Sequence, residues 1–245
     1  MTTLEAMPDS IHPIHPLRIK ICGQTRLGDA LFSAQSGAHM IGVILFSGSK
    51  RHLPLDQASA WIRQLPPTVE RVAVFVNPTV DEVMAALDQE LFHTAQLHGS
   101  EGPDFFAALN DRGLQGRLIK ALRVRNEASI ASLHEFPTRR FLLDGPEPGS
   151  GQPFDWQLAA EAVTRYPEAS FLLAGGLTPE NVATAIQSVH PHGVDVASGV
   201  ETAPGHKDPD RLQQFINNAR ATRISSTAIS KKASEKSTFG FSSFF

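Results

Sequence analysis

The chain has 245 residues, 41% of them hydrophobic, and a formal net charge of −3. This length and composition suffice for one full hydrophobic core, and the mixing of acidic and basic residues leaves no basic face for nucleic acid. No apolar stretch approaches the roughly 20 residues that span a bilayer, and residues 1–16 lack the positive start and apolar run of a secretory signal. We therefore expect a cytoplasmic protein that is not bound to a membrane.

The two ends of the chain differ from its middle. Residues 1–16 are rich in proline and include His12 and His15, while residues 224–245 are rich in serine and lysine and then in phenylalanine. The two histidines have no second ligand cluster, so we expect an exposed leader and no metal site. The tail has the composition of a disordered segment. These boundaries predict a single domain over residues 17–223.

The middle of the chain alternates between two patterns. Short, nearly continuous apolar runs are typical of strands that are buried on both faces of a parallel sheet. These runs cover residues 18–22, 40–46, 71–77, 94–98, 117–124, 141–144, 171–175 and 194–197.

Amphipathic segments follow most of these runs and predict helices. They cover residues 27–35, 55–65, 80–87, 103–109, 156–166, 180–189 and 209–220. Thr178, Pro179 and Glu180 have the order of an N-cap, a first-turn proline and a first-turn acid. About eight strand–helix units predict an α/β fold, a single (β/α)8 TIM barrel, with an open doubly wound sheet as the alternative.

In a barrel, function belongs at the carboxyl ends of the strands. The only cysteine of the chain, Cys22, stands at the end of the first strand. It has no partner for a disulfide, and it is either a small buried hydrophobe or a reactive base or nucleophile. Asp144 ends the sixth strand, where a helix cap or a loop ion pair is the structural alternative to catalysis.

Glycine-bearing loops follow the seventh and eighth strands. Gly175 and Gly176 come after the seventh strand, and Ser198 and Gly199 come after the eighth. Glycine often merely ends a strand, but it also lets backbone N–H groups approach a ligand closely. Because loops seven and eight form the usual phosphate site of a barrel, the pair predicts phosphate binding.

Several separate motifs resemble the phosphoribosylanthranilate isomerase family, from about Leu17 to Arg220. They are KICGQT (20–25), QLHG (96–99), PGSG (148–151), FDW (154–156), AGGLTPENV (174–182), GVDVASGVE (193–201) and PGHKD (204–208). The second loop departs from the family pattern, since FSGSKRH (46–52) replaces the usual Tyr-Pro-Lys-Ser before the arginine. This difference predicts a more flexible loop.

The resemblance implies an Amadori rearrangement in tryptophan biosynthesis, with no cofactor and a small-molecule substrate. It implies that Cys22 is the general base and Asp144 the general acid. It also implies that Arg51 binds the anthranilate carboxylate, with His98 and Asp195 in supporting roles at the substrate. The phosphate would bind the N–H groups of Gly175, Gly176, Ser198 and Gly199. A monomer and a homodimer both fit.

Other functions lack specific features. Hydride transfer requires Gly-x-Gly-x-x-Gly after the first strand, and metal-dependent hydrolysis requires a ligand cluster such as His-Glu-x-x-His. Another phosphosugar barrel would share the phosphate loops but would not explain the motif around Cys22. A non-catalytic phosphate-binding barrel predicts that the acid and the base are lost, whereas both are present.

Overall fold

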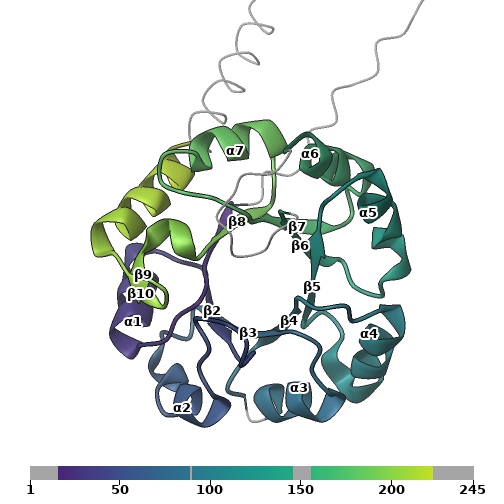
Figure 1. Ribbon diagram of the computed structural model, residues 1–245, viewed down its shortest axis with the longest axis horizontal. Coiled ribbons are helices and arrows are strands. Elements are labelled where there is room, and N and C mark those ends of the chain that lie inside the picture. The colour runs from purple at the N-terminus through teal and green to yellow at the C-terminus, as the bar shows by residue number, and fades with distance from the viewer. Residues whose placement is uncertain (1–15, 89, 146–155, 223–245) are drawn as a thin grey trace, which may run out of the picture.

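The computed structural model describes residues 16–88, 90–145 and 156–222. Its centre is a closed barrel of eight parallel strands, in which β1 completes the ring by pairing with β8. The helices surround the barrel on the outside (Figure 1). This arrangement confirms the (β/α)8 barrel and excludes the open sheet. The strands are β1 (Arg18–Ile21), β2 (Met40–Ile44), β3 (Glu70–Phe75), β4 (Thr94–Leu97), β5 (Leu118–Arg123), β6 (Arg140–Asp144), β7 (Ser170–Leu173) and β8 (Gly193–Val196).

Helices follow the strands along the described chain. They are α1 (Leu27–Ser36), α2 (Leu55–Ser59), α3 (Val80–Leu87), α4 (Pro103–Leu109), α5 (Glu127–Ala131), α6 (Trp156–Arg165), α7 (Val182–Val189) and a last helix over residues 209–222. Shorter elements are η1 (Ile62–Gln64), η2 (Asn110–Leu114), η3 (Ser132–Glu135), η4 (Ser198–Val200) and a hairpin of β9 (Glu201–Ala203) and β10 (His206–Lys207). Among the described residues, no helix is long and apolar enough to cross a membrane.

Two predicted helices differ from the structure. The predicted helix over residues 55–65 divides into α2 and η1, because Trp61 leaves helical geometry (φ −136°) while it packs against the core. The helix predicted from Glu180 begins at Val182, and Thr178 caps only a preceding turn by accepting a bond from the N–H of Glu180. By contrast, α3 has the predicted bounds, because Thr79 and Glu82 form a reciprocal capping box. The short helix α5 and the hairpin β9–β10 were not predicted.

Side chains alternate between the two surfaces of the barrel wall and produce two apolar layers. The larger layer lies between the strands and the helices. A smaller cluster contains residues from most of the strands and has Cys22 as one of its members. It consists of Cys22, Met40, Val72, Val74, Ile119, Ala121, Leu142, Leu172 and Ala174.

A charged network closes the amino-terminal end of the barrel. Glu70, the first residue of β3, accepts Arg18 Nη2 at 2.7 Å and Arg140 Nη2 at 2.6 Å, and the Thr94 hydroxyl also donates to it. Burial alone would raise the pKa of Glu70, but the charge of Arg140, with these hydrogen bonds, lowers it below its ordinary value. The network lies at the opposite end from the carboxyl ends of the strands. This position favours a role in stability and not in function.

Candidate active site

The predicted functional residues gather at one end of the barrel, because the carboxyl ends of all eight parallel strands face the same way. Cys22 directly follows β1, and Asp144 is the last residue of β6. Going round the ring from β1 through β8 and β7, β6 is the third strand, so these two residues stand across the barrel mouth from each other. A substrate bound across the mouth would lie between the predicted acid and the predicted base.

Cys22 is a buried thiol, with 5% of its surface exposed. Its backbone N–H donates to the Val196 carbonyl of β8 at 2.8 Å and continues the pairing of the strands by one residue. Burial raises the pKa of the thiol, while the charges of Lys20 and Lys207 oppose this increase. Cys22 is therefore a thiol at rest, with two ammonium groups nearby that favour its thiolate.

Asp195 lies below Cys22 and is held by a buried lysine. Lys20 Nζ donates to Asp195 Oδ1 at 2.9 Å, and the two residues are directly opposite in the β1–β8 register. Asp195 therefore fixes the position of the Lys20 ammonium, and its own negative charge raises the pKa of Cys22. A direct contact of Asp195 with the substrate stays a prediction.

Asp144 is 6% exposed and is contacted by two neighbouring groups. Its Oδ1 accepts the N–H of Gly145 at 2.8 Å, and its Oδ2 lies 3.2 Å from His98 Nε2. The His98 contact is not aligned as a hydrogen bond, and Gln96 Nε2 is 3.4 Å from the other ring nitrogen. Within the described part of the chain, His98 Nε2 and Gln96 Oε1 are buried without a hydrogen-bond partner. Such atoms are available to a bound substrate or to water.

Arg51 lies in the loop after β2 and is paired with Glu201 of β9. The guanidinium Nε donates to Glu201 Oε1 at 2.9 Å, and Nη2 donates to Oε2 at 2.7 Å. Glu201 also accepts Lys207 Nζ at 2.8 Å, and this ammonium donates to the Cys22 carbonyl at 2.6 Å. The hairpin β9–β10 thus connects the arginine loop with the cysteine backbone.

Glu201 and Lys207 are functional candidates that were not predicted from the sequence. Both lie in segments that carry the family resemblance, GVDVASGVE and PGHKD, but neither was expected to have a role. The sequence signal that could have identified them is a charged residue inside each of these two motifs. Their side chains are 4% and 1% exposed, which is rare for charged residues unless they are paired.

The two glycine-bearing loops pack directly against each other. Gly175 and Gly176 have φ of +80° and +68°, a conformation that favours glycine. A Cβ at Gly199 would lie 1.9 Å from the Leu177 carbonyl oxygen, so only glycine allows this approach.

The same loops offer backbone donors. Within the described residues, the N–H groups of Gly175 and Gly176 donate to no protein acceptor. Ser198 and Gly199 open the turn η4, whose first N–H groups precede any partner inside the turn. The loops can therefore present several N–H groups to one anion, and phosphate binding by them stays a prediction.

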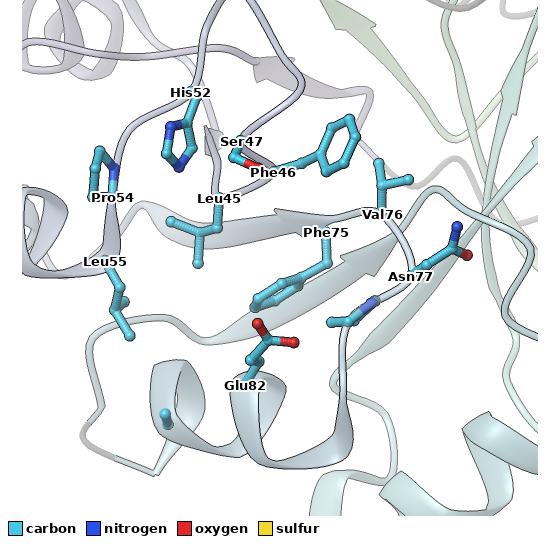
Figure 2. Close-up of a pocket in the computed structure, with 12 residues that line it drawn as sticks. Leu45, Phe46, Ser47, His52, Pro54, Leu55, Phe75, Val76, Asn77 and Glu82 are labelled. Atoms are coloured by element: carbon cyan, nitrogen blue, oxygen red, sulfur yellow. The ribbon is translucent and has the colours of Figure 1, made fainter.

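The loop after β2 is braced by its own hydrogen bonds. The N–H of Ser49 donates to the Phe46 carbonyl at 3.1 Å, and the N–H of Leu53 returns to the Ile44 carbonyl at 2.9 Å. The greater flexibility expected from its altered sequence stays a prediction. The loop borders a separate cavity of about 400 Å³, which it shares with the end of β3 and with α3; Figure 2 shows Phe46, His52 and Glu82 at its walls.

Some predicted features lie outside the described residues. These are residues 1–15, most of the sixth-loop motifs PGSG and FDW, and the chain from residue 223 onward. No cluster of three or more potential metal ligands occurs in residues 16–88, 90–145 and 156–222.

Comparison with known proteins identifies relatives over nearly the whole barrel. The family model for N-(5'-phosphoribosyl)anthranilate (PRA) isomerase matches residues 19–218. The N-(5'-phosphoribosyl)anthranilate isomerase of Pelobacter propionicus is 42% identical over 215 residues, which cover 86% of this chain and 99% of that protein.

Solved structures agree with this match. Phosphoribosylanthranilate isomerase from Thermotoga maritima superposes with a TM-score of 0.74 at 40% identity and covers 84% of this chain and 99% of its own. A phosphoribosylanthranilate isomerase in complex with reduced 1-(o-carboxyphenylamino)-1-deoxyribulose 5-phosphate has a TM-score of 0.72 at 38% identity, with the same coverage. The chain belongs to the N-(5'-phosphoribosyl)anthranilate isomerase family.

Proposed function

We propose that this isomerase converts N-(5-phosphoribosyl)anthranilate to 1-(2-carboxyphenylamino)-1-deoxyribulose 5-phosphate in tryptophan biosynthesis, with Asp144 as general acid and Cys22 as general base. The observation that carries the proposal is the placement of these two buried groups across the barrel mouth. Family membership supports the reaction, and this geometry supports the choice of the two residues.

The chemistry needs one proton donor and one proton acceptor. Asp144 gives a proton to the furanose ring oxygen, the bond from this oxygen to C1 breaks, and the nitrogen lone pair forms an imine with C1. The Cys22 thiolate then removes the proton from C2, and the electron pair gives an enaminol. Protonation at C1 and loss of the hydroxyl proton at C2 yield the ketone. No atom is gained or lost overall, as an isomerisation requires.

The resting thiol must lose its proton before it can act as the base. Burial raises the pKa of Cys22, so a thiolate forms only where nearby positive charge compensates. The ammonium groups of Lys20 and Lys207 provide part of this compensation.

Both ends of the substrate have a candidate partner. The N–H groups around Gly175, Gly176, Ser198 and Gly199 suit the phosphate. For the anthranilate carboxylate, Arg51 offers Nη1, the guanidinium nitrogen that Glu201 does not occupy. Holding both ends fixes C1 and C2 between the acid and the base.

We also propose a cytoplasmic, single-chain active site. Every group named above comes from one chain. A second copy of the chain is therefore not needed to complete the site, and a monomer and a homodimer both fit. One solved structure is of generated monomers of the dimeric phosphoribosylanthranilate isomerase from Thermotoga maritima. A lone thiol that must stay reduced favours the cytoplasm.

The test is rescue of a tryptophan auxotroph that lacks the isomerase. The chain should restore growth without tryptophan, whereas its C22S and D144N variants should not. Growth with both variants would refute the assigned roles. Failure of the unaltered chain, with soluble protein present in the cells, would refute the activity itself. The non-catalytic alternative predicts this second result.

A further inference from the structure

Lys20 of β1 and Cys22, which directly follows β1, lie one above the other on the inner side of the barrel wall. Lys20 and Cys22 are two residues apart, so the alternation of the strand directs both to the same side. Lys20 is fully buried, with 0% of its surface exposed. Its Nζ donates to Asp195 Oδ1 at 2.9 Å, and its positive charge lowers the pKa of the Cys22 thiol, against the larger opposite effect of burial.

The positively charged groups that face Cys22 differ in how many N–H donors remain free to bind its sulfur. Lys207 already gives its ammonium to Glu201 and to two backbone carbonyls, at 2.8, 2.6 and 3.3 Å. Arg51 is held by Glu201 through two nitrogens, and its third, Nη1, is the one proposed to bind the substrate carboxylate. Lys20 uses one of its three donors on Asp195, so an N–H group remains for the sulfur.

Glycine on the neighbouring strand makes room for this contact. A Cβ at Gly42 would lie 2.8 Å from Cys22 Sγ and 3.2 Å from Lys20 Cε. The sulfur and the lysine stem therefore meet over the same point of β2, in a space that no larger residue leaves open.

We propose that Lys20 is the positively charged partner of the Cys22 thiolate, and that Asp195 keeps Lys20 in position for it. This inference rests on the proposed role of Cys22 as the base. Lys20 acts through Cys22 and is a positioning residue. An anion buried away from water is strongly disfavoured unless a cation contacts it, and Lys20 supplies this cation.

The electrostatics around the pair agree with this role. Although burial disfavours its charge, Asp195 and Cys22 together raise the pKa of Lys20, so the ammonium persists at neutral pH. Burial raises the pKa of Cys22, Lys20 lowers it, and Asp195 raises it. Lys20 therefore has two separable effects: it neutralises Asp195, and it favours the thiolate.

The experiment measures how fast iodoacetamide alkylates Cys22 as a function of pH. Cys22 is the only cysteine, so mass spectrometry reports on this site alone. The variants are K20M and K20M/D195N, with K120M as the matched control. Lys120 is another buried lysine in an ion pair, 3.1 Å from Glu101, but on β5.

We expect K20M to alkylate at least about ten-fold more slowly than the wild type near neutral pH, because one unit of thiol pKa changes the thiolate fraction ten-fold. K120M should match the wild type. The double variant decides between the two effects of Lys20. If Lys20 favours the thiolate, Cys22 of K20M/D195N is still alkylated slowly, although the unpaired charge of Asp195 has also been removed.

Alkylation of K20M/D195N at the wild-type rate would overturn the inference, because Lys20 would then only neutralise Asp195. If K20M alone does not fold, the double variant carries the test by itself. The proposed function fails separately, if folded C22S keeps its isomerase activity. The alkylation profile does not depend on that outcome, since it measures the thiol and not the turnover.

Discussion

Glu201 grips Arg51 with both carboxylate oxygens, at 2.9 Å from Nε and 2.7 Å from Nη2. The same carboxylate accepts Lys207, whose ammonium is bonded to the backbone of Cys22. One buried acid therefore connects the residue proposed to hold the substrate carboxylate with the residue proposed to remove the proton. The orientation of the substrate and the position of the base depend on a shared support.

The first prediction concerns this support. E201Q should raise KM by about ten-fold, because Arg51 loses its bidentate partner and with it the orientation of Nη1. It should also lower Tm, because Lys207 keeps a buried charge without its carboxylate, a loss that costs about 3–5 kcal/mol. Steady-state kinetics and thermal unfolding measure the two effects. The matched control is E180Q, which removes an exposed pair with Arg211 at 3.7 Å and should change neither value. An unchanged KM in E201Q would show that Glu201 does not contribute to substrate binding.

Acid sensitivity should come from the other end of the barrel. The pKa of Glu70 is lowered in the folded state, so this group stabilises the fold above the ordinary glutamate pKa of about 4.3 and loses that contribution as the pH falls further. Urea unfolding between pH 7 and pH 3 should show a steeper decline in stability for the wild type than for E70Q. Parallel curves would show that the network with Arg18 and Arg140 has no part in acid unfolding.

Gly42 should be needed for turnover. In G42A, the new methyl group would lie 2.8 Å from Cys22 Sγ, which forces the sulfur or Lys20 to move. We expect kcat to fall by about ten-fold or more, since a small misplacement of a catalytic group has a large effect on rate. G28A is the control, because a Cβ at Gly28 in α1 meets nothing within 4 Å. Normal kcat in G42A would show that the site tolerates a displaced thiol.

Asp144 should be needed for ring opening. D144N keeps the size and polarity of the side chain but removes the transferable proton, so kcat should drop by about 10²–10⁴ with the fold intact. The loss of substrate fluorescence measures kcat, and circular dichroism checks the fold. A folded D144N with near-normal turnover would move the acid to another residue, such as His98, which lies 3.2 Å from Asp144.

Much of the barrel could be predicted from local sequence. A strand such as β2 is an unbroken apolar run, and α3 begins with its own capping box, so neighbours in the chain determine both. The strand ends then follow from topology, because parallel strands of a closed barrel share one functional face. For this reason the sequence alone predicts that Cys22 and Asp144 lie at the same end of the barrel.

The ion pairs could not be predicted in this way. Arg51 and Glu201 are 150 residues apart, and Lys20 and Asp195 are 175 apart, so no local pattern links them. The identity of each partner depends on barrel closure, which brings β8 beside β1. The break after α2 has a similar cause, since Trp61 leaves the helix while it packs against the core of the folded domain.

The most direct test of the account follows the fluorescence of N-(5-phosphoribosyl)anthranilate with the purified wild type and with C22S. A serine hydroxyl is far less acidic than a thiol and cannot be the base near neutral pH. We predict that the wild type consumes the substrate, and that C22S, folded and with a similar Tm, is slower by orders of magnitude. Full turnover by folded C22S, or no turnover by the folded wild type, would contradict the account.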